Sequence, residues 1–416
     1  MITYDCGLRL IVDTTKKSKI ISTGIMVNVG SLREEKAEYG LAHLVEHTLF
    51  KSTTTRNFKE TSKVLEGLGI KYNASTSKQC TYYYMDCIKD SLSQTIDIFS
   101  DMFFNGIYDF DEIENEKKVV LEEMNMCEDS SYDMLLYGIM NNMFADSIIG
   151  HRVIGDRKVI ESATPDTLKA FKEKYYTPDN MVITMVGNIT LDEADNLVQK
   201  YFVSKYNLKS AFTPRVQDKI APNIVKKYEA IQKDEKQVSC AILIHAPRLN
   251  EKSFDAFNVY ARILGTGRSS RLFETLREKE GLCYVVDASP YSNTLVGSLM
   301  VFVSTSKDKL PLALKSIKSV IQGMCDTITE EEISRAKVSL KTDLIFANDS
   351  NGIMAHSNAN ELYDFGKVMS LAKETRDIEK VTLDSVNKIA HKIAKETKFT
   401  VCAVGDKINV EDLKNF

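Results

Sequence analysis

His43-Leu44-Val45-Glu46-His47 is a short stretch in which two histidines stand four positions apart with a glutamate beside the second. On a helix, side chains at this spacing lie one above the other, roughly 5–6 Å apart at Cβ. Both imidazoles can therefore converge on one ion, and zinc accepts imidazole nitrogens at about 2.0–2.1 Å. A carboxylate on the same side can act as a general base for water. The spacing predicts a zinc-binding helix, with an amphipathic helix that merely carries two histidines as the alternative.

The residues around this stretch predict a mixture of strands and helices. Two strands are expected at 8–13 and 21–29, and the motif helix is expected from Gly40 to about residue 50. A β-hairpin is expected over 71–88. A longer, charged helix is expected over 111–127, because its apolar residues recur at helical spacing.

The second half of the chain repeats the order of the first. The predicted strand that ends in Val186-Gly187 resembles the one that ends in Val404-Gly405. Residues 111–113, at the acidic start of the long helix, correspond to residues 331–333, at almost the same offset along the chain. Two landmarks that share nearly one offset indicate a duplicated unit.

The length of 416 residues also exceeds the usual size of a single hydrophobic core. We therefore expect an α+β fold of two tandem similar domains, each a mainly antiparallel sheet with helices packed on one face. The expected domains are 1–212 and 213–416. The linker between them is expected near 205–228, where Pro214 and Pro222 interrupt any periodic pattern. The second copy has no histidines around Ala261–Gly265, where the motif helix would repeat. Metal chemistry is accordingly expected in the first domain alone.

Composition excludes several classes of protein. A net charge of −4 offers no basic surface for nucleic acid. The chain has no long apolar run and no signal-like start, so no membrane segment is expected. Its eight cysteines are scattered without a C-x-x-C pair, which is typical of reduced thiols in a cytoplasmic protein. A cytoplasmic location is expected.

A catalytic zinc ion usually takes three protein ligands, so the two histidines need a partner. The 111–127 helix is the richest source of candidates. Glu116 and Glu123 are seven residues apart, about two turns, and share one face of that helix. Spacing alone does not separate a ligand from an acid on a solvated helix face, so both interpretations stay open at this point.

The whole pattern resembles the inverzincin zinc peptidases of the pitrilysin and insulin-degrading-enzyme family. His43-x-x-Glu46-His47 is followed, further along the chain, by Glu123 in a helix of the form E-x-x-V-x-x-x-E. The compact size and the repeat point to the mitochondrial-processing-peptidase-like branch. The resemblance implies that His43, His47 and Glu123 bind one Zn²⁺ per chain and that Glu46 is the general base. It also implies that Glu116 stands behind a ligating histidine and orients it.

Two further segments extend the resemblance. Asn73-Ala74-Ser75-Thr76 is similar to a family strand whose edge pairs with the substrate backbone, so Asn73 and Ala74 are expected to bind substrate. Gly265–Ser270 lies where the processing-peptidase branch has a glycine-rich loop, but this loop is short and lacks the ending of a phosphate-binding loop. Its role stays open.

The segment Leu276–Tyr284 is similar to a second-domain segment of the family, L-R-x-x-x-G-L-x-Y. The resemblance implies that Arg277 and Tyr284 hold the peptide and donate to the developing oxyanion. The alternative is an ordinary helix that ends at Gly281, with a tyrosine on the next strand.

These expectations together describe a zinc-dependent metalloendopeptidase or oligopeptidase that hydrolyses peptides or small unfolded proteins held in a chamber. The resemblance implies a homodimer, in which Arg277 and Tyr284 act on the partner's zinc, or a heterodimer with a related chain. Two other functions compete: a non-catalytic scaffold or partner subunit of the same fold, and a maturation peptidase dedicated to one partner peptide.

Overall fold

The computed structural model describes residues 1–144, 147–209 and 227–416. These residues form two compact units, each assembled from three segments. The first unit consists of Met1–Met124, the described part of Arg152–Asp218, and Phe346–Met369. The second consists of the described parts of Asn125–His151 and Lys219–Ile345, together with Ser370–Phe416. The predicted domain boundary at 212/213 and its two prolines lie outside the described residues.

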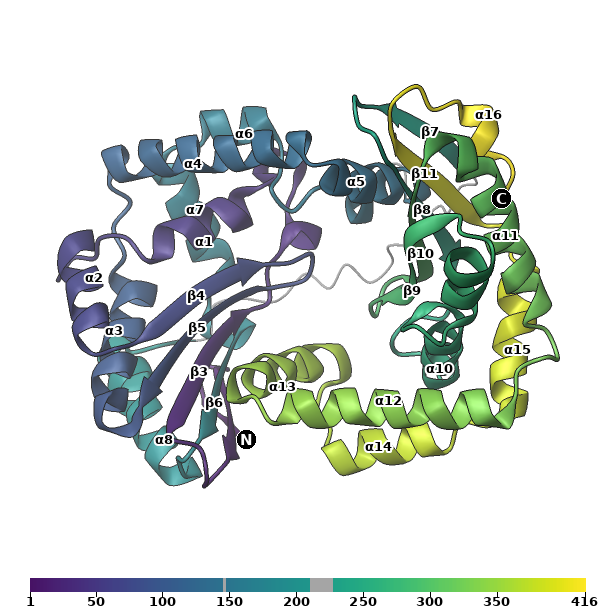
Figure 1. The fold of residues 1–416 in the computed structure, drawn as a ribbon. Helices are drawn as coiled ribbons and strands as arrows, with labels where there is room; N and C mark the ends of the chain where they lie inside the picture. The colour runs from purple at the N-terminus through teal and green to yellow at the C-terminus, as the bar shows by residue number, and fades with distance from the viewer. Residues whose placement is uncertain (145–146, 210–226) are drawn as a thin grey trace. The chain divides into compact units, whose positions relative to one another are not determined.

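The first unit is built on a six-stranded sheet in the order β1-β2-β6-β3-β5-β4. Figure 1 labels its strands β6, β3, β5 and β4. Neighbouring strands are antiparallel except for β2 and β6, which are parallel. β4 is the last strand of the order, so its outer backbone edge has no strand neighbour in the described part of the chain. The strands are β1 (Ile2–Thr3), β2 (Arg9–Thr14), β3 (Ile20–Val27), β4 (Lys71–Thr76), β5 (Thr81–Ile88) and β6 (Met181–Gly187).

One face of this sheet carries a layer of helices. Alternate strand residues such as Ile25 and Tyr83 point to that face, as the two-residue period of a strand requires, and are fully buried among the helices. The helices of this layer are α1 (Leu41–Leu49), α2 (Phe58–Gly67), α3 (Leu92–Asn105), α4 (Phe110–Asp129), α6 (Arg157–Ser162), α7 (Pro165–Tyr175) and α8 (Leu191–Val198), continued by the π-helix η6 (Gln199–Val203) and by α9 (Ser204–Tyr206).

The other face of the first sheet is covered as well, by a helix from the second half of the chain. α13 (Asn351–Phe365) contributes Ala359 and Leu362 to a small core with Met26 and Tyr82, whose side chains point away from the main helix layer. The Tyr363 hydroxyl donates a hydrogen bond to the backbone oxygen of Asn180 at 2.8 Å. Helices on one face were expected from the sequence, and this additional helix was not.

The second unit has a five-stranded sheet in the order β7-β11-β8-β10-β9, which matches β2-β6-β3-β5-β4 strand for strand. The one parallel pair, β7 and β11, also corresponds. α5 (Ser131–Met143), from the first half of the chain, packs on β11 and β8. The strands are β7 (Lys227–Gln232), β8 (Val238–His245), β9 (Cys283–Ser292), β10 (Gly297–Thr305) and β11 (Phe399–Gly405). The other helices are α10 (Phe254–Gly265), η7 (Phe273–Lys279), α11 (Leu310–Gly323), α12 (Glu330–Asn348), α14 (Leu371–Glu379), α15 (Leu383–Ala394) and α16 (Val410–Leu413).

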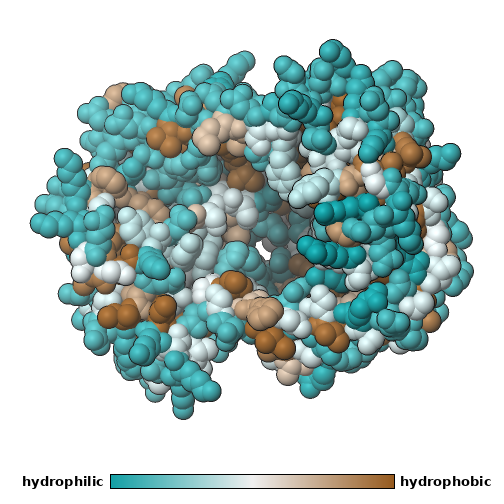
Figure 2. All heavy atoms as spheres, viewed as in Figure 1, coloured by the Kyte–Doolittle hydropathy of each residue, from teal (hydrophilic) through white to brown (hydrophobic). Residues whose placement is uncertain are grey.

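This architecture confirms the predicted fold class: an α+β chain with two similar, mainly antiparallel sheets. The corresponding strands β3 and β8 begin at Ile20 and Val238, the same offset that separates Gly187 from Gly405 in the sequence. Hydrophilic side chains cover most of the face visible in Figure 2. Among the described residues, no helix has both the length and the apolarity needed to cross a bilayer.

Candidate metal centre

The candidate metal centre lies in the first unit, where α1 faces α4 (Figure 1). Both helices bury one apolar face in the same core, α1 through Leu41 and Leu44 and α4 through Val120 and Met124. Because a helix has 3.6 residues per turn, burying one face fixes the direction of the side chains next to it. The polar faces that carry the motif histidines and the acids of α4 therefore meet.

The three predicted ligands are brought together at this point. Donor atoms of His43, His47 and Glu123 all lie within 4.8 Å of one another. The Glu123 carboxylate oxygen Oε2 is 3.8 Å from Nε2 of His43 and 3.6 Å from Nε2 of His47. Tetrahedral zinc, with bonds of about 2.0–2.1 Å, needs neighbouring ligand atoms roughly 3.3 Å apart. The two distances from Glu123 are close to this value, so the three side chains suit a zinc ion after small movements.

The remaining ring nitrogen of His47 has a fixed partner. Its Nδ1 lies 3.1 Å from Oε2 of Glu116, while Oε1 of Glu116 is 2.5 Å from the Lys51 ammonium nitrogen. Burial alone would raise the pKa of Glu116, but its contacts with His47 and Lys51 outweigh burial and lower the pKa. A hydrogen bond on Nδ1 leaves Nε2 of His47 free to bind a metal. Glu116 thus lies where the sequence expectation requires, behind a candidate ligand.

His43 differs from His47 in its surroundings. Burial, together with the charge of His47, lowers the pKa of His43 to about 4. A neutral imidazole is the form that binds metal. Burial also disfavours protonation of His47, but hydrogen bonding to Glu116 and the negative charges nearby raise its pKa overall. Nδ1 of His43 is buried without a hydrogen-bond partner among the described residues.

Glu46 is held by a residue from the neighbouring strand. The Thr76 hydroxyl, at the end of β4, donates a 2.5 Å hydrogen bond to Oε2 of Glu46. Burial raises the pKa of Glu46, and the charge of Glu123 acts in the same direction against the opposing effects of Thr76 and His47. A half-buried carboxylate with a raised pKa, next to a metal cluster, has the properties that a general base needs.

Lys51 and Thr76 contact the site but were not assigned a role from the sequence. Lys51 follows His47 by four positions, and this spacing was a signal that it continues the same face of the motif helix. Thr76 belongs to the segment that resembles the substrate strand, but its contact with Glu46 joins residues 30 positions apart. No local pattern reveals a contact of that kind.

Asn73 and Ala74 lie in the middle of β4, the edge strand. Asn73 is exposed and Ala74 is half-buried, in keeping with alternation along the strand. The outer backbone edge has no strand neighbour among the described residues, although the Ala74 N–H donates to Oδ1 of Asn73 at 2.9 Å. An edge strand of this kind can pair with an extended peptide. Binding of substrate by these two residues stays a prediction.

Arg277 and Tyr284 lie in the second unit and contact each other. The Arg277 guanidinium carbon is 4.9 Å from the centre of the Tyr284 ring and 4.8 Å from that of Phe273. Arg277 is part of the π-helix η7, a form often found at functional sites. Tyr284 is 75% exposed at the start of β9. Their action on a bound peptide stays a prediction.

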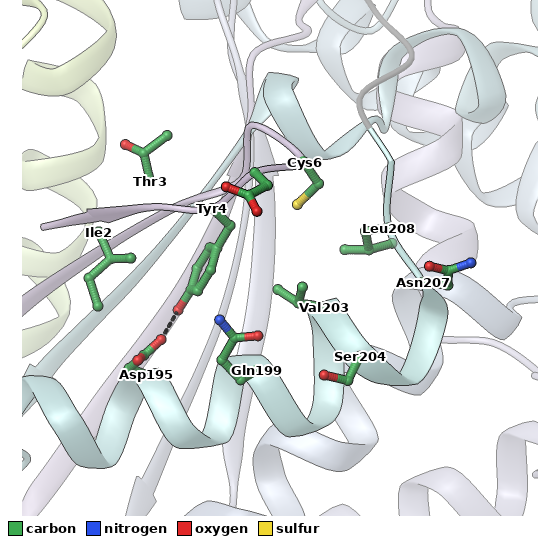
Figure 3. A pocket seen from close by; sticks show the side chains of 11 residues that line it. Ile2, Thr3, Tyr4, Cys6, Asp195, Gln199, Val203, Ser204, Asn207 and Leu208 are labelled. Carbon is green, nitrogen blue, oxygen red and sulfur yellow. Dashed lines mark hydrogen bonds between the residues drawn. The ribbon is translucent and has the colours of Figure 1, made fainter.

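Other hollows lie apart from these residues. A cavity of about 520 Å³ lies between the N-terminal segment and the α8–α9 region, where the Tyr4 hydroxyl donates to Asp195 at 2.8 Å (Figure 3). A smaller one, of about 250 Å³, is lined by Thr266–Gly267 and Ser269–Ser270 of the glycine-containing loop. None of the predicted metal-site residues lines either cavity.

Two family models match successive parts of the chain. Residues 9–157 match the family model described as "Insulinase (Peptidase family M16)", and residues 162–340 match the one described as "Peptidase M16 inactive domain". The second description fits a repeat in which no histidine stands around Ala261–Gly265.

Relatives and solved structures cover nearly the whole chain. An uncharacterized zinc protease of Mycobacterium leprae is 31% identical over 93% of this chain and 87% of its own length. An uncharacterized zinc protease of Bacillus subtilis is 28% identical over 94% of this chain and 95% of its own length. The fold is similar to that of a protease from Helicobacter pylori, with a TM-score of 0.85 and 22% identity. The match covers 97% of this chain and 98% of that protein's chain. From these matches and the motif they enclose, the chain belongs to the insulinase family of peptidases.

Proposed function

We propose that this chain is a zinc-dependent metallopeptidase with one zinc ion, held by His43, His47 and Glu123. The observation that carries the proposal is the convergence of these three side chains, from two helices, within 4.8 Å. A fourth group, Glu46, lies on α1 between the two histidines and is held by Thr76. A scaffold has no need for a base beside two ligands.

Zinc, when bound in such a site, lowers the pKa of water to about 7 and polarises a carbonyl oxygen. Glu46 would accept the proton of the attacking water and deliver it to the amine that leaves. A positioned general base of this kind contributes about 10²–10⁴-fold to the rate. The hydrogen bond from Thr76 keeps the Glu46 carboxylate in one orientation while it carries out this transfer.

Substrate would be held mainly through its backbone. The outer edge of β4, with Asn73 and Ala74, offers N–H and C=O groups to an extended peptide. Arg277 and Tyr284 supply a guanidinium and a phenol that could hold the peptide and donate to the oxyanion. Binding of this kind depends on few side chains of the substrate, which suits peptides or small unfolded proteins of varied sequence.

A first test replaces the base and a ligand separately. Glu46→Gln should keep stoichiometric zinc and lose peptide hydrolysis by about 10²-fold or more, whereas Glu123→Ala should lose zinc as well. Glu122→Gln is the matched control, because Glu122 is the exposed neighbour of Glu123 on the same helix. Zinc is measured by elemental analysis, and hydrolysis with a mixed peptide library with and without a chelator. Full activity in Glu46→Gln, or full zinc in Glu123→Ala, would refute the assignment.

The proposal extends to a homodimer in which Arg277 and Tyr284 serve the partner's metal centre. His47→Ala and Tyr284→Ala, each inactive alone, are mixed and allowed to exchange subunits. Recovery of part of the activity would support action across the interface. Verified heterodimers with no recovery would contradict it, without affecting the metal assignment.

A further inference from the structure

The first turn of the metal-binding helix has no cap of its own. The residue at its N-cap position is Gly40, and the first turn carries neither an acid nor a side-chain cap. The first backbone N–H groups of any helix lack partners within the helix and need another acceptor. Serine, threonine, aspartate or asparagine at the N-cap normally supplies it.

Position 40 has no room for such a side chain. The φ angle of Gly40 is +98°, a conformation that residues with a side chain rarely adopt. A Cβ atom there would lie 2.7 Å from the backbone oxygen of Ile154 and 2.9 Å from Cα of Gly155. The acceptor for the first turn must therefore come from elsewhere in the chain.

Glu34 supplies the acceptor. Its Oε2 accepts a hydrogen bond from the backbone N–H of Gly40 at 3.0 Å, and its Oε1 accepts one from that of Ala42 at 2.8 Å. Glu34 is only 2% exposed, so water does not compete for these donors. A carboxylate at this end also interacts favourably with the positive end of the helix dipole.

The segment that carries Glu34 is itself anchored to the hairpin beside the site. The backbone N–H of Leu32 donates to the oxygen of Lys78 at 2.8 Å, and that of Ser31 donates to the oxygen of Ser77 at 3.3 Å. Thr76, directly before this turn, holds Glu46. The same hairpin thus fixes the start of α1 through Glu34 and its middle through Thr76.

We infer that Glu34 is a positioning residue for the metal centre: it holds the first turn of α1 and thereby the imidazole of His43. His43 is the third residue of α1, within the turn that loses its order first when a cap is lost. The inference rests on the proposed function for its consequence, zinc binding, but the capping itself is a property of the metal-free protein. In the second unit, the corresponding helix α10 carries an acid, Asp255, in its own first turn.

The experiment compares Glu34→Ala and Glu34→Gln with Glu38→Gln. Glu38 belongs to the same loop but contacts Lys174 and Tyr175 instead of α1. Hydrogen exchange of the amides of residues 41–45 is measured in the metal-free full chain, and the zinc dissociation constant by competition with a chelator. Glu34→Ala should accelerate exchange and weaken zinc binding by about tenfold each. Glu34→Gln keeps one acceptor, so its exchange rates and its zinc dissociation constant should lie between those of Glu34→Ala and those of Glu38→Gln. Glu38→Gln itself should match wild type in both measurements.

The two readouts separate the possible failures. Unchanged exchange and unchanged zinc affinity in both Glu34 variants would overturn the inference, as would equal effects in Glu38→Gln. If Glu34→Ala does not fold, Glu34→Gln decides by the same two measurements. A wild-type chain that binds no zinc would refute the proposed function, while the exchange measurement would still decide whether Glu34 caps α1.

Discussion

Replacement of Glu116 by glutamine tests how much the acid behind His47 contributes to the metal centre. Glu116 is nearly buried and bridges Nδ1 of His47, at 3.1 Å, and the Lys51 ammonium, at 2.5 Å. Glutamine has the same shape but only one acceptor, so it cannot accept from both partners. Loss of an acid that orients a ligating histidine costs about 10–100-fold in metal affinity. This range corresponds to about 1.4–2.7 kcal/mol of binding free energy.

The assay is a competition titration of the metal-free protein and zinc against a chromogenic chelator. Glu112→Gln is the matched control, because Glu112 lies one turn earlier on α4 and accepts hydrogen bonds from Ser52. Its zinc affinity should stay within about threefold of wild type. An unchanged dissociation constant in Glu116→Gln would show that the contact with His47 does not support the metal. A loss as large as that of Glu123→Ala would show that Glu116 is itself a ligand.

Three further outcomes are expected. Thr76→Val removes the hydrogen bond to Glu46 and should lower kcat about tenfold or more with zinc content unchanged; an unchanged kcat would contradict a role in holding the base. Burial raises the pKa of Glu34 from 4.5 to about 7, although its hydrogen bonds from Gly40 and Ala42 act in the opposite direction, so the stability linked to its proton is complete below pH 4.5 and is lost as the pH rises through 7. The glutamine of Glu34→Gln does not titrate, so the free energy of unfolding of this variant should rise by up to about 3 kcal/mol relative to that of wild type as the pH increases over this range. Denaturant titrations of both proteins at pH 5 and pH 8 measure this change, and the same difference between the two proteins at both pH values would refute it. Gly40→Ala should lower the free energy of unfolding by more than Gly69→Ala does, because both glycines have positive φ but only Gly40 has backbone atoms within 3 Å of an added Cβ; equal thermal midpoints in the two variants would contradict this.

Local patterns in the sequence were sufficient for much of this description. His43 and His47 are four residues apart on one helix, so their convergence follows from helical geometry wherever the helix packs. The duplication was visible as a nearly constant offset, and the matching strand orders of the two sheets confirm it. The absence of histidines around Ala261–Gly265 already restricted the candidate metal site to one copy.

Only the tertiary structure decided which side chains surround the histidines. Glu116 and Glu123 share a helix face by spacing, but their approach to α1 depends on how α1 and α4 pack on the core. The contacts of Thr76 with Glu46 and of Glu34 with the start of α1 join residues that no helical or strand period relates. Local sequence patterns also do not show that α5, from the first half of the chain, packs on the second sheet, or that α13, from the second half, packs on the first sheet. Periodicity determines the faces of single elements, whereas burial of those faces against one another determines the partners.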